Sequence, residues 1–171
     1  MSWAAFEAAA PELARDARAL VERLGFVYAG TVRRDGAPRI SPVEARVVGG
    51  ELMLVMIAAS RKVSDLARDP RITLQSPVTD PEDPGAELKV RGRVVEVSET
   101  ERVADAVEAT SGWRPRPSWR FFAVVVDAVA IIGWEHGDMV LRRWDRERGA
   151  LPVSRRRLDA EASAYRIVGD R

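Results

Sequence analysis

The sequence predicts a mainly β fold with inserted helices, built as an antiparallel β-barrel in a single domain over residues 1–171. About seven or eight short β-prone runs follow one another, and tight-turn signals separate several of them. Close hairpins with few crossover helices favour an antiparallel barrel over a doubly wound parallel sheet. We expect a helical arm (1–25), the barrel (26–145) and an arginine-rich tail with weak patterning (146–171).

The N-terminal arm has the start and stop signals of helices. Ser2 can cap a first turn, and Pro11 suits the first position of the helix that follows. Gly25 supplies a C-terminal stop. Because apolar residues recur at helical spacing, we expect an amphipathic helix over one end of a sheet. These residues are Leu13, Ala17, Leu20, Val21 and Leu24.

The barrel region begins with two predicted hairpins. Its first three β-prone runs are Phe26–Val32, Arg39–Val48 and Leu52–Ile57. The turn signals between them are Arg34-Asp35-Gly36 and Gly49-Gly50. Pro42 lacks the N–H that a strand ladder needs, so it predicts a bulge or an unpaired edge position, where a ligand can approach the backbone.

Two short helices are predicted between the later strands. Ser60 can cap the first, which should end at Asp69 because Pro70 follows. Ser98 and Glu101 have the spacing of a capping box for the second. The later β-prone runs are 72–75, 88–94, 121–126, 129–134 and 139–144.

The composition is typical of a soluble, cytoplasmic protein. The formal net charge of +1 gives no field that would attract nucleic acid or an anionic membrane. The absence of cysteine excludes disulfides, thiol nucleophiles and cysteine-ligated metals. No apolar run approaches the ~20 residues of a spanning helix, and the chain start lacks the basic region of a signal peptide. No residue spacing indicates a metal site, and nothing singles out a catalytic residue.

Ser60-Arg61-Lys62 is the strongest candidate for a binding site. It follows a predicted buried strand and opens a helix, where free backbone N–H groups and the helix dipole favour an anion. Two cations at this position are unfavourable by about 0.3–1 kcal/mol, so they suggest a bound phosphate. A capped surface helix with exposed charges is the alternative that these residues leave open.

Other groups allow both a functional and an ordinary interpretation. The segment Arg39–Pro42 could run along a planar ring or form a plain edge strand. The cations of the 88–94 run could line a pocket or a dimer interface, or they could be solvated. His136, the only histidine, falls in an expected turn and is more typical of an exposed residue than of an iron ligand. The tryptophans near arginines suit stacking on a flat ligand or core packing: Trp113, Trp119, Trp134 and Trp144.

Five short segments are weak signals one by one, but their order along the chain is a more specific pattern. They are Gly30-Thr31-Val32, Asp35–Val43, Gly50–Leu54, Ser60–Leu66 and Asp69–Ile72. Together they resemble the pyridoxamine 5′-phosphate oxidase-like superfamily of flavin-binding split β-barrels. The resemblance covers roughly residues 26–97. It implies an antiparallel split β-barrel and a homodimer with two cofactor sites at the subunit interface.

The resemblance also implies a set of cofactor-binding residues. These are Arg39, Ile40, Ser41, Pro42, Val43, Met56, Ile57, Ser60, Arg61, Lys62, Gln75, Trp134 and Arg142. Arg61 and Lys62 would grip the flavin phosphate, while 39–43 and 56–57 would border the ring. Gln75 would offer the ring a polar contact. The last two residues would come from the second subunit.

Two departures argue against oxidation of pyridoxamine phosphate itself. Glu44 stands where the vitamin-processing oxidases carry a basic residue, and their late Arg-x-His-x-Arg signature is absent from Met139–Trp144. The short, arginine-rich chain is more similar to an actinobacterial-type branch. Members of that branch use flavin mononucleotide (FMN) or the 5-deazaflavin coenzyme F-420, and some bind haem.

We therefore predict an FMN-binding oxidoreductase that acts on an unidentified small organic substrate. One alternative is a reductase that depends on coenzyme F-420. A second is a flavin- or haem-binding protein without catalytic turnover, and a third is a barrel that serves only as a dimeric scaffold.

Overall fold

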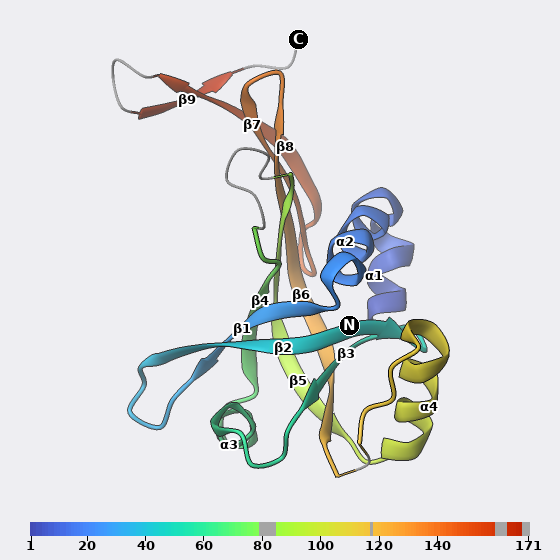
Figure 1. Cartoon of the computed structure of the whole chain (residues 1–171). Coiled ribbons are helices and arrows are strands. Elements are labelled where there is room, and N and C mark those ends of the chain that lie inside the picture. The colour runs from blue at the N-terminus through green and yellow to red at the C-terminus, as the bar shows by residue number, and fades with distance from the viewer. Residues whose placement is uncertain (79–84, 117, 160–163, 169–171) are drawn as a thin grey trace.

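The computed structural model describes residues 1–78, 85–116, 118–159 and 164–168. Within them lie the helices α1 (Trp3–Ala9), α2 (Pro11–Leu24), α3 (Arg61–Arg68) and α4 (Thr100–Ser111) (Figure 1). The strands are β1 (Phe26–Val32), β2 (Pro38–Val48), β3 (Glu51–Met56), β4 (Arg71–Gln75), β5 (Glu87–Val97), β6 (Arg120–Glu135), β7 (Asp138–Asp145), β8 (Gly149–Asp159) and β9 (Ala164–Val168).

Six of the strands close into an antiparallel barrel, which confirms the predicted architecture. They neighbour one another in the order β3-β2-β1-β4-β5-β6, and β3 also pairs with β6. In this closing pair, Met53 lies opposite Ala123 and Met56 lies opposite Arg120. Closure pairs the edges that an open sheet would leave exposed.

Pro42 lies at an unpaired edge of β2, one of the two placements that its sequence predicted. It lies opposite Tyr28 of β1, whereas the pairing of β2 with β3 begins only at Glu44. The proline nitrogen therefore leaves no gap in a ladder. The first half of β2 is open along one side, where a ligand can reach its backbone.

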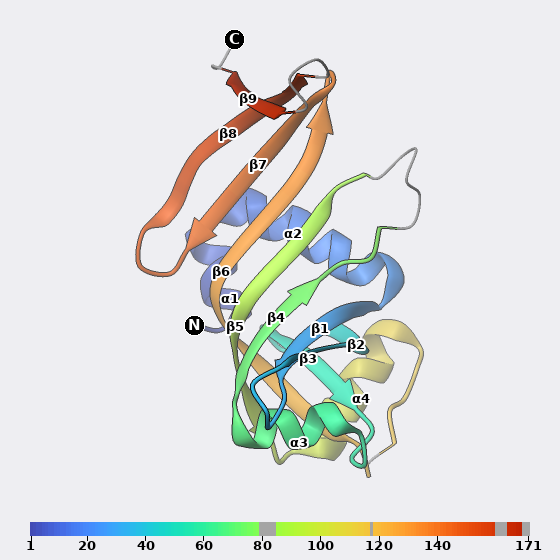
Figure 2. The same ribbon diagram turned by 90° about the vertical axis from the view of Figure 1, so that its left-hand side faces the viewer.

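β6 is one continuous strand, although the sequence predicted two runs. The predicted break at Asp127 coincides with a β-bulge, because Arg91 and Gly92 of β5 pair with residues on either side of it. β6 continues beyond the barrel and carries β7, β8 and β9 as an extension of the sheet (Figure 2). β8 and β9 form in the tail that showed only weak patterning, since the pairing of β8 with β7 and of β9 with β8 supplies order that the local sequence does not encode.

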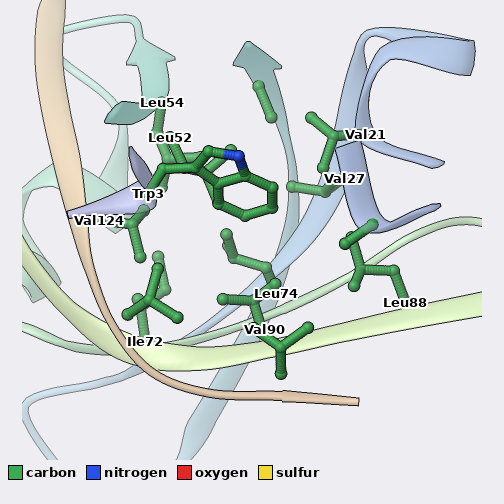
Figure 3. Close-up of a cluster of buried hydrophobic side chains, with 14 of the residues drawn as sticks. Trp3, Val21, Val27, Leu52, Leu54, Ile72, Leu74, Leu88, Val90 and Val124 are labelled. Atoms are coloured by element: carbon green, nitrogen blue, oxygen red, sulfur yellow. The ribbon is translucent and has the colours of Figure 1, made fainter. Parts of the chain in front are cut away.

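The N-terminal arm is part of the core. Ser2 caps α1 by accepting the N–H of Ala5 at 3.2 Å, Pro11 begins α2, and Gly25 ends it at φ 70°. The fully buried ring of Trp3 lies among apolar side chains of β1, β3, β4, β5 and β6 (Figure 3). The side chains around Trp3 include Leu52, Leu54, Leu74, Val90 and Val124.

No described helix is long and apolar enough to cross a membrane.

The capping box predicted at Ser98 and Glu101 is wrong. α4 begins at Thr100 with Glu99 as its N-cap residue, and no side chain makes a capping hydrogen bond. The Glu101 carboxylate instead lies 2.9 Å from a guanidinium nitrogen of Arg114. This ion pair holds the carboxylate away from the backbone N–H that a capping box would use.

Gly92 lies at the β-bulge, where the backbones of β5 and β6 approach closely. A Cβ added there would overlap the carbonyl oxygen of Val125. We expect Gly92→Ala to lower the free energy of unfolding by about 1–3 kcal/mol, as overpacking does. Gly133→Ala is the matched control, because its Cβ would meet only Ala86 at 3.9 Å. Urea unfolding measures both variants, and equal stabilities would contradict the close approach.

Candidate functional site

The start of α3 presents polar groups without protein partners. Ser60 is the N-cap residue, but its hydroxyl makes no capping bond, and the buried Oγ has no hydrogen-bond partner among the described residues. The N–H of Val63 bonds the Ser60 carbonyl at 3.0 Å, and within the described chain the N–H groups of Arg61 and Lys62 have no acceptor. Buried polar atoms are nearly always paired, so this cluster fits a site built for an anionic ligand.

Lys62 adds a positive charge to this cluster. Its side chain is half-buried, and burial lowers the pKa of the Lys62 ammonium below its ordinary value. It has no ion pair or hydrogen bond with another described residue, whereas Lys89 lies 3.7 Å from Glu87. An ammonium that is partly desolvated and unpaired gains from a neighbouring anion.

Lys62 lines a hollow of about 410 Å³, which we call the ring hollow. Its walls are mainly apolar. They are formed by residues of β1, β2 and β3 and by Trp119, which directly precedes β6. Five of the residues that the resemblance implied meet here: Pro42, Val43, Met56, Ile57 and Lys62. The other lining residues are Phe26, Glu44, Val55 and Trp119. A flat apolar ring with a phosphate at one end matches this arrangement of surfaces.

Arg61 lines a different hollow of about 470 Å³, which we call the arginine hollow. Five guanidinium groups face only two carboxylates there, so the hollow carries net positive charge. Arg61 and Lys62, predicted to share one phosphate, therefore line different hollows. Arg61 lines the arginine hollow and Lys62 lines the ring hollow, although both residues belong to the first turn of α3. The remaining residues of the arginine hollow are Arg33, Arg34, Asp35, Arg39, Ser64, Asp65 and Arg68.

Asp65 ties α3 to the barrel. The carboxylate is only 6% exposed, and its Oδ2 accepts hydrogen bonds from Arg39 Nε at 2.6 Å and Thr31 Oγ1 at 3.1 Å. Arg68 lies 3.6 Å from Oδ1. Burial by itself raises the pKa of Asp65, but the hydrogen bonds and the neighbouring guanidinium charges outweigh it, so the pKa is lowered. Arg39, predicted to contact the cofactor, is thus held in place by Asp65.

Three other predicted residues lie outside the ring hollow. Ile40 is 76% exposed and lines a broad hollow of about 1030 Å³ together with arginines of β4 and β5. Gln75 and Pro42 lie on either side of Tyr28 in register, so β1 separates Gln75 from the ring hollow. Ser41, in the open half of β2, lines neither the ring hollow nor the arginine hollow.

Trp134 and Arg142 meet at the other end of the molecule. They line a hollow of about 250 Å³, and Arg142 Nη1 donates to Asp16 Oδ2 at 2.7 Å. That hydrogen bond lowers the pKa of Asp16. The turn joining β6 to β7, which contains the exposed His136, and α3 lie at opposite ends of the molecule (Figures 1 and 2). One chain therefore does not bring Trp134 and Arg142 to α3.

Sequence reasoning did not single out several residues of these hollows, among them Trp119, Phe26 and Asp65. Trp119 was one of four tryptophans near arginines, and Phe26 was an ordinary strand residue, so no local signal placed either in the ring hollow. Asp65 is buried together with Val63 and Leu66, but helical spacing places it off the face that Val63, Leu66 and Ala67 share, so the pattern did not assign it to the core. Among the described residues, no group of three histidines or carboxylates could hold a metal ion.

Solved structures with a similar fold bind different ligands. An F-420 reductase is 22% identical to this chain, with a TM-score of 0.52 over 66% of this chain and 94% of its own. A haem-binding protein from Mycobacterium smegmatis is also 22% identical, with a TM-score of 0.58 over 75% of this chain and 57% of its own. PhzG from Burkholderia lata 383, solved with tetrahydrophenazine-1-carboxylic acid, is 11% identical, with a TM-score of 0.61 over 85% of this chain and 90% of its own. These likenesses show the shared fold.

The family assignment comes from the sequence as a whole. A search among curated proteins finds no match. Residues 13–133, well over half of the chain, match the sequence profile described as pyridoxamine 5′-phosphate oxidase. This match agrees with the family that the ordered motifs between residues 30 and 72 resembled. The chain therefore belongs to the pyridoxamine 5′-phosphate oxidase family.

Proposed function

We propose that this protein binds FMN and acts as an oxidoreductase on a small organic substrate. The observation that carries the proposal is the start of α3. There the Ser60 hydroxyl and the backbone N–H groups of Arg61 and Lys62 have no partner among the described residues, and the unpaired ammonium of Lys62 lines the apolar ring hollow. These groups fit a phosphate that continues into a flat ring system.

The protein would bind, orient and shield the cofactor. Ser60 and Lys62 would hold the phosphate, and Pro42, Val43 and Met56 would form the apolar bed of the ring. When bound, FMN supplies the hydride or single-electron chemistry. The apolar walls would exclude water from the reacting face, and the family membership supports this use of the fold.

A homodimer would complete the site. Trp134 is 46% exposed and lies with Arg142 far from α3 of its own chain, so a second subunit would have to supply them. Light scattering at low micromolar concentration should give the mass of two subunits. A clean monomer that retains FMN would contradict this part of the proposal.

The cofactor itself is the first thing to measure. An absorption spectrum of the protein as purified should show flavin bands, and mass spectrometry of the released small molecule should identify FMN. A haem Soret band, or apo-protein that fails to bind FMN in a titration, would overturn the proposal. Steady reoxidation of reduced flavin by an added acceptor would distinguish an enzyme from a binding protein.

The arginine hollow favours coenzyme F-420 as a second candidate. That coenzyme carries carboxylates beyond its phosphate, and the five guanidinium groups of the arginine hollow could receive them. An F-420 reductase shares the fold. Titration of the same apo-protein with FMN and with F-420 decides between them, because Arg33 and Arg34 of the arginine hollow should matter only for the longer anion.

Ser60→Ala should separate ligand binding from stability. Loss of a capping hydroxyl usually costs about 0.5–2 kcal/mol, but Ser60 makes no capping bond, so apo-protein stability should stay unchanged. FMN binding should weaken by about 1.5 kcal/mol, as expected for a hydrogen bond to a charged group. Ser2→Ala is the control with the opposite pattern, since Ser2 does cap α1. A destabilised Ser60→Ala variant with unchanged FMN affinity would contradict the assignment.

A further inference from the structure

Glu44 brings a carboxylate to an otherwise apolar part of the ring hollow. On β2 it lies opposite Phe26 of β1 and Val55 of β3, and all three residues line the hollow. Its side chain is 43% exposed, so its oxygens can be reached from the hollow. In charge, Glu44 is the counterpart of Lys62, which lines the same hollow.

The Glu44 carboxylate keeps free hydrogen-bonding capacity. It accepts no hydrogen bond from any described residue, and the nearest cation, Arg46, has its Nη2 3.7 Å from Glu44 Oε2. The other terminal nitrogen of Arg46 donates to the carbonyl oxygens of Gly25 and Ala45. Arg46 is therefore committed to the backbone and only weakly compensates Glu44. A ligand that brings a hydrogen-bond donor and a positive charge would compensate it better.

Trp119 supplies a second surface of the same hollow that favours cations. Its ring lies 5.7 Å from that of Trp113 at an interplanar angle of 48°. Both pack against the buried cluster beneath α4, so the indole is held by its neighbours. The face of an indole ring attracts positive charge and also offers a large apolar area. Carboxylate and indole together form a site for a cation with an apolar body.

We propose that the Glu44 and Trp119 walls of the ring hollow, which the flavin bed of Pro42, Val43 and Met56 does not use, select an organic cation, namely a small and mainly apolar molecule that carries a protonated amine or nitrogen heterocycle. The positive nitrogen lies at Glu44 and the apolar body against Trp119. This inference rests on the proposed function, because a cofactor phosphate would pair Lys62 and leave Glu44, which Arg46 compensates only weakly, as the charge of the hollow that a substrate can meet. Anionic molecules are repelled, and neutral ones cover the carboxylate without pairing it.

Three probes of nearly equal shape test the charge preference. Benzylamine, benzyl alcohol and benzoate are titrated into the FMN-loaded protein, and the change in the flavin absorption spectrum gives each dissociation constant. Benzylamine should bind about tenfold more tightly than benzyl alcohol, as close charge pairs at interfaces commonly do. Benzoate should bind most weakly.

Variants of Glu44 separate selection by charge from selection by shape. Glu44→Gln should remove most of the preference for benzylamine, and Glu44→Lys should reverse the order so that benzoate binds best. Glu22→Gln is the matched control, since that carboxylate on α2 has a comparable exposed fraction of 47%. It should leave the order of the three probes unchanged.

The outcomes distinguish this inference from the proposed function. If FMN binds but the three probes bind equally, or if Glu44→Gln keeps the full preference, the cation site is wrong and the flavin assignment stands. If FMN does not bind, the proposed function fails, and NMR titration of the same probes into the apo-protein still tests Glu44. An order of affinities that depends on Glu44 supports the cation site in either form.

Discussion

Replacing Arg61 and Lys62 together by Ala is expected to weaken FMN binding by about 3–6 kcal/mol, since a charge-assisted contact contributes about 1.5–3 kcal/mol. The structure divides this effect between the two positions. Lys62 lines the ring hollow, whereas Arg61 lines the arginine hollow. Lys62→Ala should therefore weaken FMN binding more than Arg61→Ala does. Fluorescence titration of the apo-protein with FMN measures all three variants.

The second lysine provides the control for this experiment. Lys89→Ala also removes one ammonium, but Lys89 is already paired with Glu87 and lies outside the ring hollow. FMN affinity should stay unchanged in that variant. Lys62→Ala should not destabilise the apo-protein, because Lys62 has no partner among the described residues and burial disfavours its charge. An unchanged dissociation constant in the double variant would remove the basis of the phosphate site.

The parts of the fold that the sequence predicted correctly depend on local signals. Turn residues placed the early hairpins, and Pro42 marked the unpaired stretch of β2 because a proline cannot donate to a ladder. The closing pair β3–β6 and the strands β8 and β9 depend on partners distant in the chain. No short window encodes such pairings. Asp127 interrupts the β-prone pattern, and such an interruption is compatible with either the end of a strand or a bulge. The pairing of β6 with β5 determines that a bulge forms there.

The candidate site divides in the same way. Ser60 and Lys62 could be found because a helix start after a strand is a local pattern with known chemistry. Trp119 reaches the ring hollow from the segment before β6, which no spacing in the sequence relates to β2 or β3. The two residues of the distant hollow, Trp134 and Arg142, need a second chain to take part. Their role stays a prediction until the assembly is measured.

Asp65→Asn is expected to lower the free energy of unfolding by about 3 kcal/mol. The change removes the negative charge that holds Arg39 and Arg68, and an unpaired charge in a buried place costs about 3–5 kcal/mol. We expect the lower end of this range because the Arg39 side chain is 26% exposed, so water can partly solvate its charge. Asp105→Asn is the control, since that carboxylate is also helical and paired with an arginine but is 67% exposed. Its unfolding midpoint in urea should change little.

The pH dependence of this effect identifies its cause. The pKa of Asp65 is lowered in the folded state from its ordinary value of 3.8. Its contribution is therefore complete above that value and is lost as the pH falls through the folded pKa, because the unfolded state takes up its proton first. The stability difference between wild type and Asp65→Asn should shrink at acidic pH. A difference that stays constant from neutral pH to well below 3.8 would mean that packing, and not the charge of Asp65, holds α3 against the barrel.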